Sequence, residues 1–351
     1  MRALEVMFVT ITTDSEKTID PQAAQQLVFQ LGTGYILSAA LHVAVSLRIA
    51  DQLADGPRSV SELANASGAN DDALYRVLRS LSSAGVFVES GPRQFSNNVA
   101  SDQLKAGTTG LYEMVLWMSD RFHFQVYADI MHSVKTGQPA VEKTLGMPVF
   151  EYFPKNPDLS ERFNNAMTAF SAVVIPAVLK VYDFTGIGTL VDVAGGHGQV
   201  LTSILSAYPS MKGVLADLPH VLAGAEPRIR AMGLADRCRL EAIDFFKAVP
   251  SGGDAYIMKH IIHDWDDEKS IAILKNIRSA MNPGGRVILL DSVLPPANQP
   301  DFGKIIDLEM MLMPGGRERT EEEFRSLFEH AGFRLTKIVR TESPLSVIEA
   351  R

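Results

Sequence analysis

The chain has 351 residues, 46% of them hydrophobic, and a formal net charge of −8 with a sequence pI near 5.5. This charge excludes a general binder of nucleic acid or anionic membranes, because both partners require a basic footprint. The single cysteine, Cys238, cannot form an intrachain disulfide, and neither a signal-cleavage pattern nor a membrane-spanning apolar stretch is expected, so the expected location is cytoplasmic.

Residues 22–54 are rich in alanine, leucine and valine and contain few charges. The pattern predicts one or two helices that are apolar nearly all round and therefore buried. A small N-terminal domain cannot cover so much apolar helix surface by itself. A second subunit is one candidate partner, which predicts a homodimer.

Residues 59–96 predict a helix, a glycine-centred turn, a second helix and a hairpin that turns at Gly91 and Pro92. This winged-helix order binds DNA in some proteins and serves only for packing or dimerisation in others. Asp71 and Asp72 open the second helix, where they would face phosphates, and the charges of the segment nearly cancel. We therefore favour a module that does not bind nucleic acid.

Residues 108–182 look helical, and beyond Gly186 strands alternate with helices. This alternation predicts a parallel, doubly wound α/β sheet. The last two strands are joined by a short turn and should form an antiparallel hairpin. Thr320 and Glu323 form a capping box that opens another helix. The expected strands are Thr189–Val193, Gly213–Asp217, Arg239–Ala242, Ala255–Lys259, Val287–Asp291, Leu335–Val339 and Ser346–Glu349.

The first strand of this sheet ends in "LVDVAGGHGQV". A glycine-rich turn here is where doubly wound folds bind nucleotide-like ligands, and the less favoured alternative is a tight strand–helix turn without a ligand. As a dinucleotide fingerprint the match is poor, because Leu201 stands where the third small residue belongs.

Acids follow the second and third strands. Asp217 lies where a carboxylate accepts ribose hydroxyls, and the alternative is a helix N-cap, since Pro219 follows. Asp244 could accept a hydrogen bond from the amine of an adenine, and Phe245 could stack on its ring. The alternative is a loop acid beside a core phenylalanine. Three such signals in order, at the ends of strands one to three, favour a nucleoside site.

The fourth strand ends in "IMKHIIHDWDD". In an extended chain His260 and His263 point to opposite faces, and no thiolate or further histidine cluster is nearby, which disfavours a metal site. We expect a structural role for His260 and a catalytic role for His263, because the strand delivers it to the edge that carries the glycine turn.

Six segments stand in an order that resembles the small-molecule O-methyltransferases that use S-adenosylmethionine. They are "VDVAGGHG", "ADLPHV", "IDFF", "MKHIIHDWDDEK", "GRVILLDSVLP" and "PGGRERTEEEF". The family includes plant phenolic, animal hydroxyindole and bacterial secondary-metabolite enzymes. The resemblance covers nearly the whole chain. It implies a Rossmann-like class I methyltransferase domain at 106–351 after a mostly helical winged-helix dimerisation domain at 1–105.

The resemblance also implies residue roles. His263 matches the general base, and Asp291 and Glu318 match two acids that flank it. Met167 and Met310 resemble the methionines that clamp an acceptor ring. The implied cofactor contacts are Gly195, Gly196 and Gly198 along the methionine part, Asp217 on the ribose, Asp244 and Phe245 near the adenine, and Lys259.

Three positions depart from the family pattern. Ala194 replaces a first glycine, which is tolerable if that residue is extended. Ile243 replaces the usual glycine before Asp244, and Asp291 has a shorter arm than the glutamate of plant members.

The sequence therefore predicts methyl transfer from S-adenosylmethionine to a hydroxyl, expected to be phenolic, of a small aromatic metabolite. The products are the ether and S-adenosylhomocysteine, and no metal is needed. A winged-helix regulator that binds a metabolite without catalysis and a nicotinamide-dependent oxidoreductase are the alternatives. The motifs do not name the acceptor.

Overall fold

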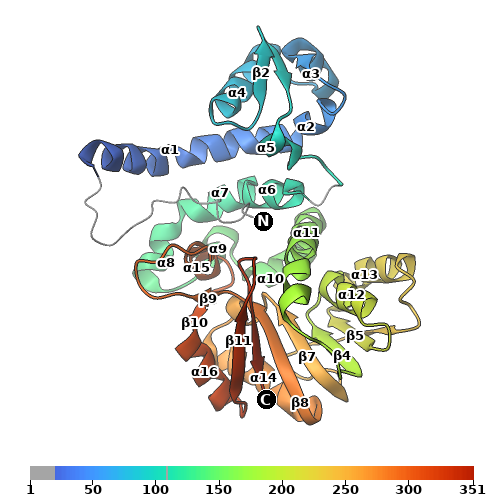
Figure 1. The fold of residues 1–351 in the computed structure, drawn as a ribbon. Coiled ribbons are helices and arrows are strands. Elements are labelled where there is room, and N and C mark those ends of the chain that lie inside the picture. The colour runs from blue at the N-terminus through green and yellow to red at the C-terminus, as the bar shows by residue number, and fades with distance from the viewer. Residues whose placement is uncertain (1–19, 108–109) are drawn as a thin grey trace. The chain divides into compact units, whose positions relative to one another are not determined.

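The computed structural model describes residues 20–107 and 110–351, which form two compact units (Figure 1). One unit holds residues 20–125 and 158–170, and the other holds residues 126–157 and 171–351. Helix α11 (Pro157–Val181) contributes to both. The domain boundary predicted after residue 105 stays a prediction, since the limit of a compact unit and the limit of a domain are different properties.

The first unit is mainly helical. Helix α1 begins behind Asp20, whose side chain accepts a hydrogen bond from the Ala23 amide, and Pro21 occupies its first turn. The elements are α1 (Pro21–Ser46), α2 (Ile49–Gln52), β1 (Arg58–Ser59), α3 (Val60–Ser67), α4 (Asp71–Ser83), β2 (Val88–Gly91), β3 (Gln94–Ser96), α5 (Val99–Asp102), α6 (Tyr112–Met118) and α7 (Arg121–Ala128), the last of which runs on into the second unit.

The predicted winged helix is confirmed. Strands β2 and β3 form the antiparallel hairpin, and β1, which the sequence pattern missed, pairs with β3. Arg93 in the hairpin turn makes ion pairs with Asp71 and Asp72 at the start of α4. The wing arginine is therefore neutralised within the unit by the acids that open the second helix.

Helix α1 is exposed over much of its length, so the prediction that it is buried is wrong within a single chain. Only Ala40, Ala44 and Val45 near its end are buried. The exposed large side chains are Val28, Phe29, Leu31, Tyr35, Ile36 and Leu37. The expectation that no apolar stretch reaches membrane-spanning length is also wrong, because α1 and α11 pass that test by length and composition.

The second unit is built on a seven-stranded sheet in the order β11-β12-β8-β7-β4-β5-β6. The five adjacent strands from β8 to β6 run parallel, whereas β12 is antiparallel to both β8 and β11, which confirms the predicted sheet and terminal hairpin. The strands are β4 (Thr189–Val193), β5 (Lys212–Asp217), β6 (Cys238–Ala242), β7 (Gly253–Lys259), β8 (Met281–Asp291), β11 (Leu335–Arg340) and β12 (Ser346–Ala350).

Helices separate most of these strands as the alternation predicts (Figure 1), but the expected helix between β6 and β7 is wrong, because residues 243–252 form a loop there. The Thr320–Glu323 capping box is present at the start of α16. A two-stranded parallel pair, β9 (Val293–Leu294) with β10 (Arg319–Thr320), was not predicted. The helices are α8 (Ile130–Thr136), α9 (Ala140–Leu145), α10 (Val149–Tyr152), α12 (Gln199–Ala207), α13 (Pro219–Ala231), α14 (Asp267–Ala280), α15 (Gly303–Leu312) and α16 (Glu321–His330).

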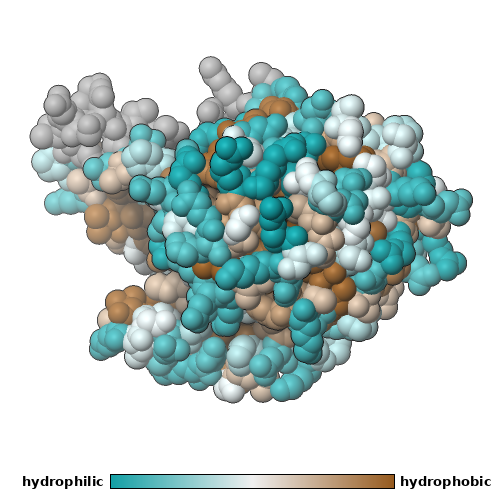
Figure 2. Space-filling model, turned by 90° about the horizontal axis from the view of Figure 1, so that it is seen from below, coloured by the Kyte–Doolittle hydropathy of each residue, from teal (hydrophilic) through white to brown (hydrophobic). Residues whose placement is uncertain are grey.

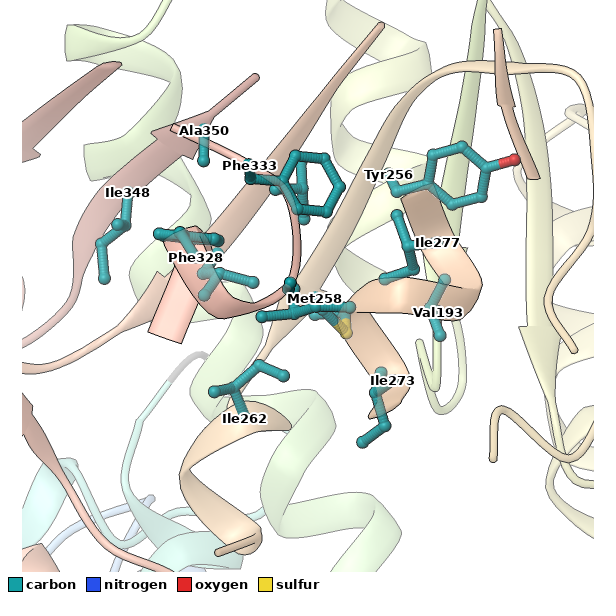
Figure 3. Packing of buried hydrophobic residues seen from close by; sticks show 14 of the residues in the cluster. Val193, Tyr256, Met258, Ile262, Ile273, Ile277, Phe328, Phe333, Ile348 and Ala350 are labelled. Atoms are coloured by element: carbon teal, nitrogen blue, oxygen red, sulfur yellow. The ribbon is translucent and has the colours of Figure 1, made fainter. Parts of the chain in front are cut away.

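The core of this unit lies between the sheet and the helices α14 and α16. Val193, Tyr256 and Ile277 are fully buried there, and Phe328 packs against the strand that carries Ile348 (Figure 3). On the face seen in Figure 2, hydrophilic side chains predominate and hydrophobic ones lie scattered among them, as on an ordinary surface in contact with water.

Candidate active site

The functional candidates of the second unit lie along the carboxyl edge of the sheet. Asp291 ends β8, Lys259 ends β7 and Asp217 ends β5. The glycine turn 194–198 follows β4, which lies between β7 and β5. This is the edge where open α/β sheets bind ligands, at the point where the strand order reverses.

The glycine turn is shaped by close packing. A side chain at Gly195 would place its Cβ 2.5 Å from Asp192 Cγ and 2.5 Å from Leu215 Cδ1, so only glycine fits. The condition under which Ala194 would be tolerable, an extended backbone, is not met, because its φ is +56°. Glycine, which many family members have at this position, adopts that left-handed conformation freely, whereas alanine is strained in it by about 1–2 kcal/mol.

Ala194→Gly should therefore stabilise the protein. The relieved strain exceeds the entropy that a new glycine adds to the unfolded chain, which leaves a net gain of about 0.5–1 kcal/mol. A urea titration followed by circular dichroism would measure it as a higher midpoint. A lower midpoint would show that the alanine methyl group contributes more by packing than its backbone loses by strain.

Asp217 is tied to the glycine turn. Its Oδ2 accepts a hydrogen bond from the Gly196 amide at 2.8 Å, and its Oδ1 accepts one from the Leu218 amide at 2.6 Å. Burial raises the pKa of Asp217, and the two amide donors oppose that rise. Each carboxylate oxygen has a second lone pair, so acceptor capacity for two hydroxyl groups remains.

Asp217→Ala should weaken S-adenosylmethionine binding by about 1–3 kcal/mol, because two ribose donors would lose a charged acceptor. Titration calorimetry measures this directly. Asp183→Ala is the matched control, since Asp183 is an exposed acid that accepts a hydrogen bond from the nearby Thr185 amide. Equal affinities in both variants would remove Asp217 from the binding site.

Asp244 and Phe245, the residues predicted to contact the adenine, lie just beyond β6. Asp244 is partly exposed and forms an ion pair with Lys247 at 2.9 Å. Phe245 packs edge-on against Trp265, with ring centroids 6.1 Å apart, and Phe246 lies 4.9 Å from the same indole. The structure thus brings three aromatic rings together here, and Trp265 was not singled out by the sequence.

Lys259 is half-buried and lies near several carboxylates. Burial lowers the pKa of Lys259 to about 8, while the charges of Asp291, Asp192 and Asp264 oppose that shift. Asp192, near the end of β4, is 1% exposed, and burial together with the charge of Asp217 raises its pKa to about 7. Sequence reasoning missed Asp192. Its only signal was an acid inside the apolar strand "LVDV".

The chain turns sharply after β7. His260 has a φ of +54°, and a short 3-10 helix (Ile262–Asp264) follows at once. Consequently the two imidazoles are stacked, with ring centroids 4.4 Å apart and planes 26° from parallel. The expectation that they point to opposite faces is wrong, because it assumed an extended chain.

His263 is paired with Glu318. Its Nδ1 lies 2.7 Å from Glu318 Oε1, and its Nε2 lies 3.5 Å from Asp264 Oδ1. His263 and Glu318 are 4% and 1% exposed, respectively, so the pair is shielded from water. Glu318 therefore holds one ring nitrogen and leaves Nε2 as the other proton-transfer position.

Backbone packing brings Glu318 to the histidine. The Arg317 amide donates to the His263 carbonyl at 2.8 Å, and the Glu318 amide donates to Asp307 Oδ1 at 2.7 Å. At Gly316 a Cβ would lie 2.0 Å from the His263 carbonyl oxygen, so any side chain there would displace the histidine turn. The pairing of β9 with β10 aligns this segment with the chain that leaves Asp291.

Asp291 is fully buried but is not the hydrogen-bond partner of the imidazole. Among the residues that the structure describes, neither of its carboxylate oxygens meets a hydrogen-bond partner. Burial raises the pKa of Asp291 to about 7, and the nearby His263 opposes that rise. Its contribution to the site is therefore through charge, whereas Glu318 orients the ring.

The acids change the basicity of the histidine. Burial disfavours the imidazolium, but the carboxylates of Glu318, Asp264 and Asp291 outweigh it and raise the pKa of His263 to about 9. Burial, with the neighbouring charges of His263 and Lys259, lowers the pKa of His260 well below its ordinary value. The stacked rings thus differ: His260 is neutral at pH 7, and His263 readily holds a proton.

His260, His263 and Asp291 place possible metal-ligand atoms within 4.8 Å of one another. Imidazole coordinates a metal through a lone pair in the plane of its ring. The rings of His260 and His263 lie 26° from parallel, and Nδ1 of His263 is already held by Glu318.

The two predicted methionines belong to different units. Met310 is buried on α15 in the unit that holds His263, and Met167 lies on the part of α11 that belongs to the other unit. A clamp formed by both therefore stays a prediction.

Comparisons with known proteins show the family to which the chain belongs. Residues 127–334 match the model of the O-methyltransferase domain, and residues 29–106 match that of the O-methyltransferase dimerisation domain. The chain is 40% identical to phenazine O-methyltransferase PhzM of Lysobacter antibioticus, with 93% of this chain and 95% of the relative covered.

Two solved structures are also similar. A crystal structure of LaPhzM matches with a TM-score of 0.90 and 39% identity, covering 93% of this chain and 99% of that one. An O-methyltransferase of neocarzinostatin biosynthesis, solved with S-adenosylmethionine and 2-hydroxy-5-methyl naphthoic acid, matches with a TM-score of 0.77 and 30% identity, covering 89% and 95%. The chain therefore belongs to the O-methyltransferase family and is an S-adenosylmethionine-dependent methyltransferase.

Proposed function

We propose that this enzyme methylates a phenolic hydroxyl of a small aromatic metabolite, with His263 as the general base and Glu318 as its orienting acid. The observation that carries the proposal is the buried hydrogen bond between His263 Nδ1 and Glu318 Oε1 at 2.7 Å, beside the edge that holds Lys259 and the glycine turn. Gly195, Gly196, Gly198, Asp217, Asp244, Phe245 and Lys259 are the proposed contacts of S-adenosylmethionine.

The methyl donor supplies an electrophilic methyl group on a sulfonium. His263 Nε2 takes the hydroxyl proton as the acceptor oxygen forms its bond to that carbon and the carbon–sulfur bond breaks. Glu318 accepts a hydrogen bond from the Nδ1–H of the ring and stabilises the imidazolium that results. A base with a pKa of about 9 is well matched to a phenol of pKa about 10, because proton transfer between them is nearly balanced.

The relatives support the class of acceptor. One is named for phenazine, and a solved neighbour holds a hydroxylated naphthoic acid. Both are flat aromatic molecules, which suit a flexible and polarisable methionine such as Met310. We propose an acceptor of this kind, a fused or substituted ring with a free hydroxyl.

The proposed reaction uses no metal. An imidazole that hydrogen-bonds Glu318 and stacks on His260 is arranged for proton transfer rather than chelation. The wing arginine is already paired with Asp71 and Asp72, so the winged helix is proposed to pack and dimerise rather than bind DNA. We retain the cytoplasm as the proposed location.

A substrate screen tests the reaction. The full-length enzyme is incubated with S-adenosylmethionine carrying a deuterated methyl group and a panel of hydroxylated phenazines, naphthoic acids and benzoates. Mass spectrometry should show a labelled product that acid treatment does not return to the acceptor, as expected for an aryl ether. The same compounds with the hydroxyl already methylated are the controls. Tight donor binding with no labelled product from any acceptor would favour the non-catalytic regulator.

Helix α1 is proposed to lie in a homodimer interface, because its exposed side chains from Phe29 to Leu37 lie in the segment matched by the dimerisation domain. Such an interface should exceed about 2,000 Å². Phe29→Glu with Leu31→Glu, at side chains that are 72% and 74% exposed, should convert the dimer to a monomer in light scattering. Met232→Glu, at an exposed apolar residue of the other unit, should leave the mass unchanged. A monomeric wild type at micromolar concentration would contradict the proposal.

A further inference from the structure

The guanidinium of Arg319 is buried beside the histidine turn. The residue is 1% exposed, although a buried cation is costly unless it is well paired. Its single ion-pair partner among the described residues is Asp267, at 2.7 Å, and the side chain of that aspartate is 58% exposed. The remaining donors of Arg319 are directed elsewhere.

Those donors meet the two carbonyls that bracket the base. Nη1 donates to the Ile262 carbonyl at 3.0 Å, and Nη2 donates to the Trp265 carbonyl at 2.9 Å. His263 lies between these residues. Ile262 also belongs to the buried hydrophobic cluster that contains Met258 and Ile273 (Figure 3). The planar guanidinium thus spans the turn and fixes both of its ends.

Arg319 directly follows Glu318 in the chain, in strand β10. One side chain therefore connects the turn that carries the proposed base to the strand that carries its orienting acid. A 1 Å misplacement of a catalytic group can cost about 100-fold in rate, so such a connection bears on the reaction.

We propose that Arg319 is a positioning residue for methyl transfer, which holds the turn Ile262–Trp265 at the distance that keeps His263 hydrogen-bonded to Glu318. The inference rests on the proposed roles of His263 and Glu318. Other groups also face His263: Lys259 and His260 precede it, Asp264 follows it, and Asp291 lies at the end of β8. Arg319 acts on the histidine through backbone position, unlike these charges.

Two variants of the full-length enzyme test this. Arg319→Met removes every donor, and Arg319→Lys keeps the buried charge but has one ammonium that cannot span two carbonyls. We expect the Met variant to lower kcat by about 10–100-fold and the Lys variant to fall between it and wild type, with donor affinity unchanged. Arg325→Met is the matched control, since Arg325 is an exposed arginine paired with Glu321 on α16.

A second readout separates positioning from simple loss of stability. NMR titration of the His263 ring in the donor-bound enzyme should give a lower pKa in both Arg319 variants, because the imidazolium loses its close carboxylate. Lost stability alone would lower the folded fraction without moving that titration. If the Met variant does not fold, the Lys variant still provides both measurements.

The outcomes distinguish the two proposals. A lower His263 pKa with a lower kcat supports positioning. A lower pKa with normal kcat would show that Arg319 holds His263 against Glu318 but would overturn its role in methyl transfer, together with the assignment of His263 as the base. An unchanged His263 pKa in a folded variant would overturn the positioning role of Arg319. Arg319 would then contribute only to the stability of the fold, whether or not His263 is the base.

Discussion

Replacing His263 with alanine should lower kcat by about 10²–10⁴-fold, the usual scale for loss of a general base. Donor affinity should barely change, because the imidazole is not among the proposed nucleoside contacts. Raising the pH should partly rescue the variant with a phenolic acceptor, since the phenolate then forms without a base. Single-turnover assays with the acceptor identified by the screen would measure all three effects.

His330→Ala is the matched control, because His330 is an exposed histidine that contacts the Ser326 carbonyl on α16. A chelator should leave the wild type fully active. Near-normal kcat for the His263 variant on the true acceptor would mean that the oxygen is activated elsewhere or that the reaction is not O-methylation. Loss of activity on chelation would instead favour a metal held by His260, His263 and Asp291.

Glu318→Gln should be nearly as damaging and should also change the pH dependence. The base acts when deprotonated, so wild-type kcat/KM should rise with pH until about pH 9, the pKa to which Glu318 and its neighbouring acids raise His263. Without the charge of Glu318 that pKa falls toward its ordinary value of about 6.5. The acid limb therefore moves to lower pH, while the plateau drops by about 10²–10⁴-fold because the ring loses its orienting acceptor.

One consequence is specific to this mechanism: the defect of the Glu318 variant should shrink as the pH is lowered. Glu322→Gln, at an exposed acid in the first turn of α16, is the control and should retain the wild-type profile. A parallel downward shift of the whole profile, with its limb unmoved, would show that Glu318 does not set the basicity of His263.

The sheet could be predicted from the sequence because its signals are local. Apolar runs such as Thr189–Val193 and the break at each glycine recur with the period of strand and helix, and the first strand was predicted to the residue. Parallel strands then place their carboxyl ends at one edge, so Asp217, Lys259 and Asp291 had to share it. The capping box at Thr320 and Glu323 is likewise a signal confined to four residues.

The conformation of the turn that carries His263 depends on tertiary structure. The alternation of side chains along a strand predicted that His260 and His263 point to opposite faces. The left-handed backbone of His260 and the 3-10 turn after it bring the two rings together instead. The backbone at Gly316 packs directly against the backbone of that turn. No local pattern shows such a contact.

The electrostatics of the site and the environment of the first helix were also beyond local patterns. A free imidazole has a pKa of about 6.5, whereas three acids from separate segments raise the pKa of His263 to about 9. Helix α1 has an apolar composition that the sequence shows plainly, yet its own chain covers only its end. Burial depends on which surfaces meet, so composition shows that a helix needs a partner and only an assembled structure supplies one.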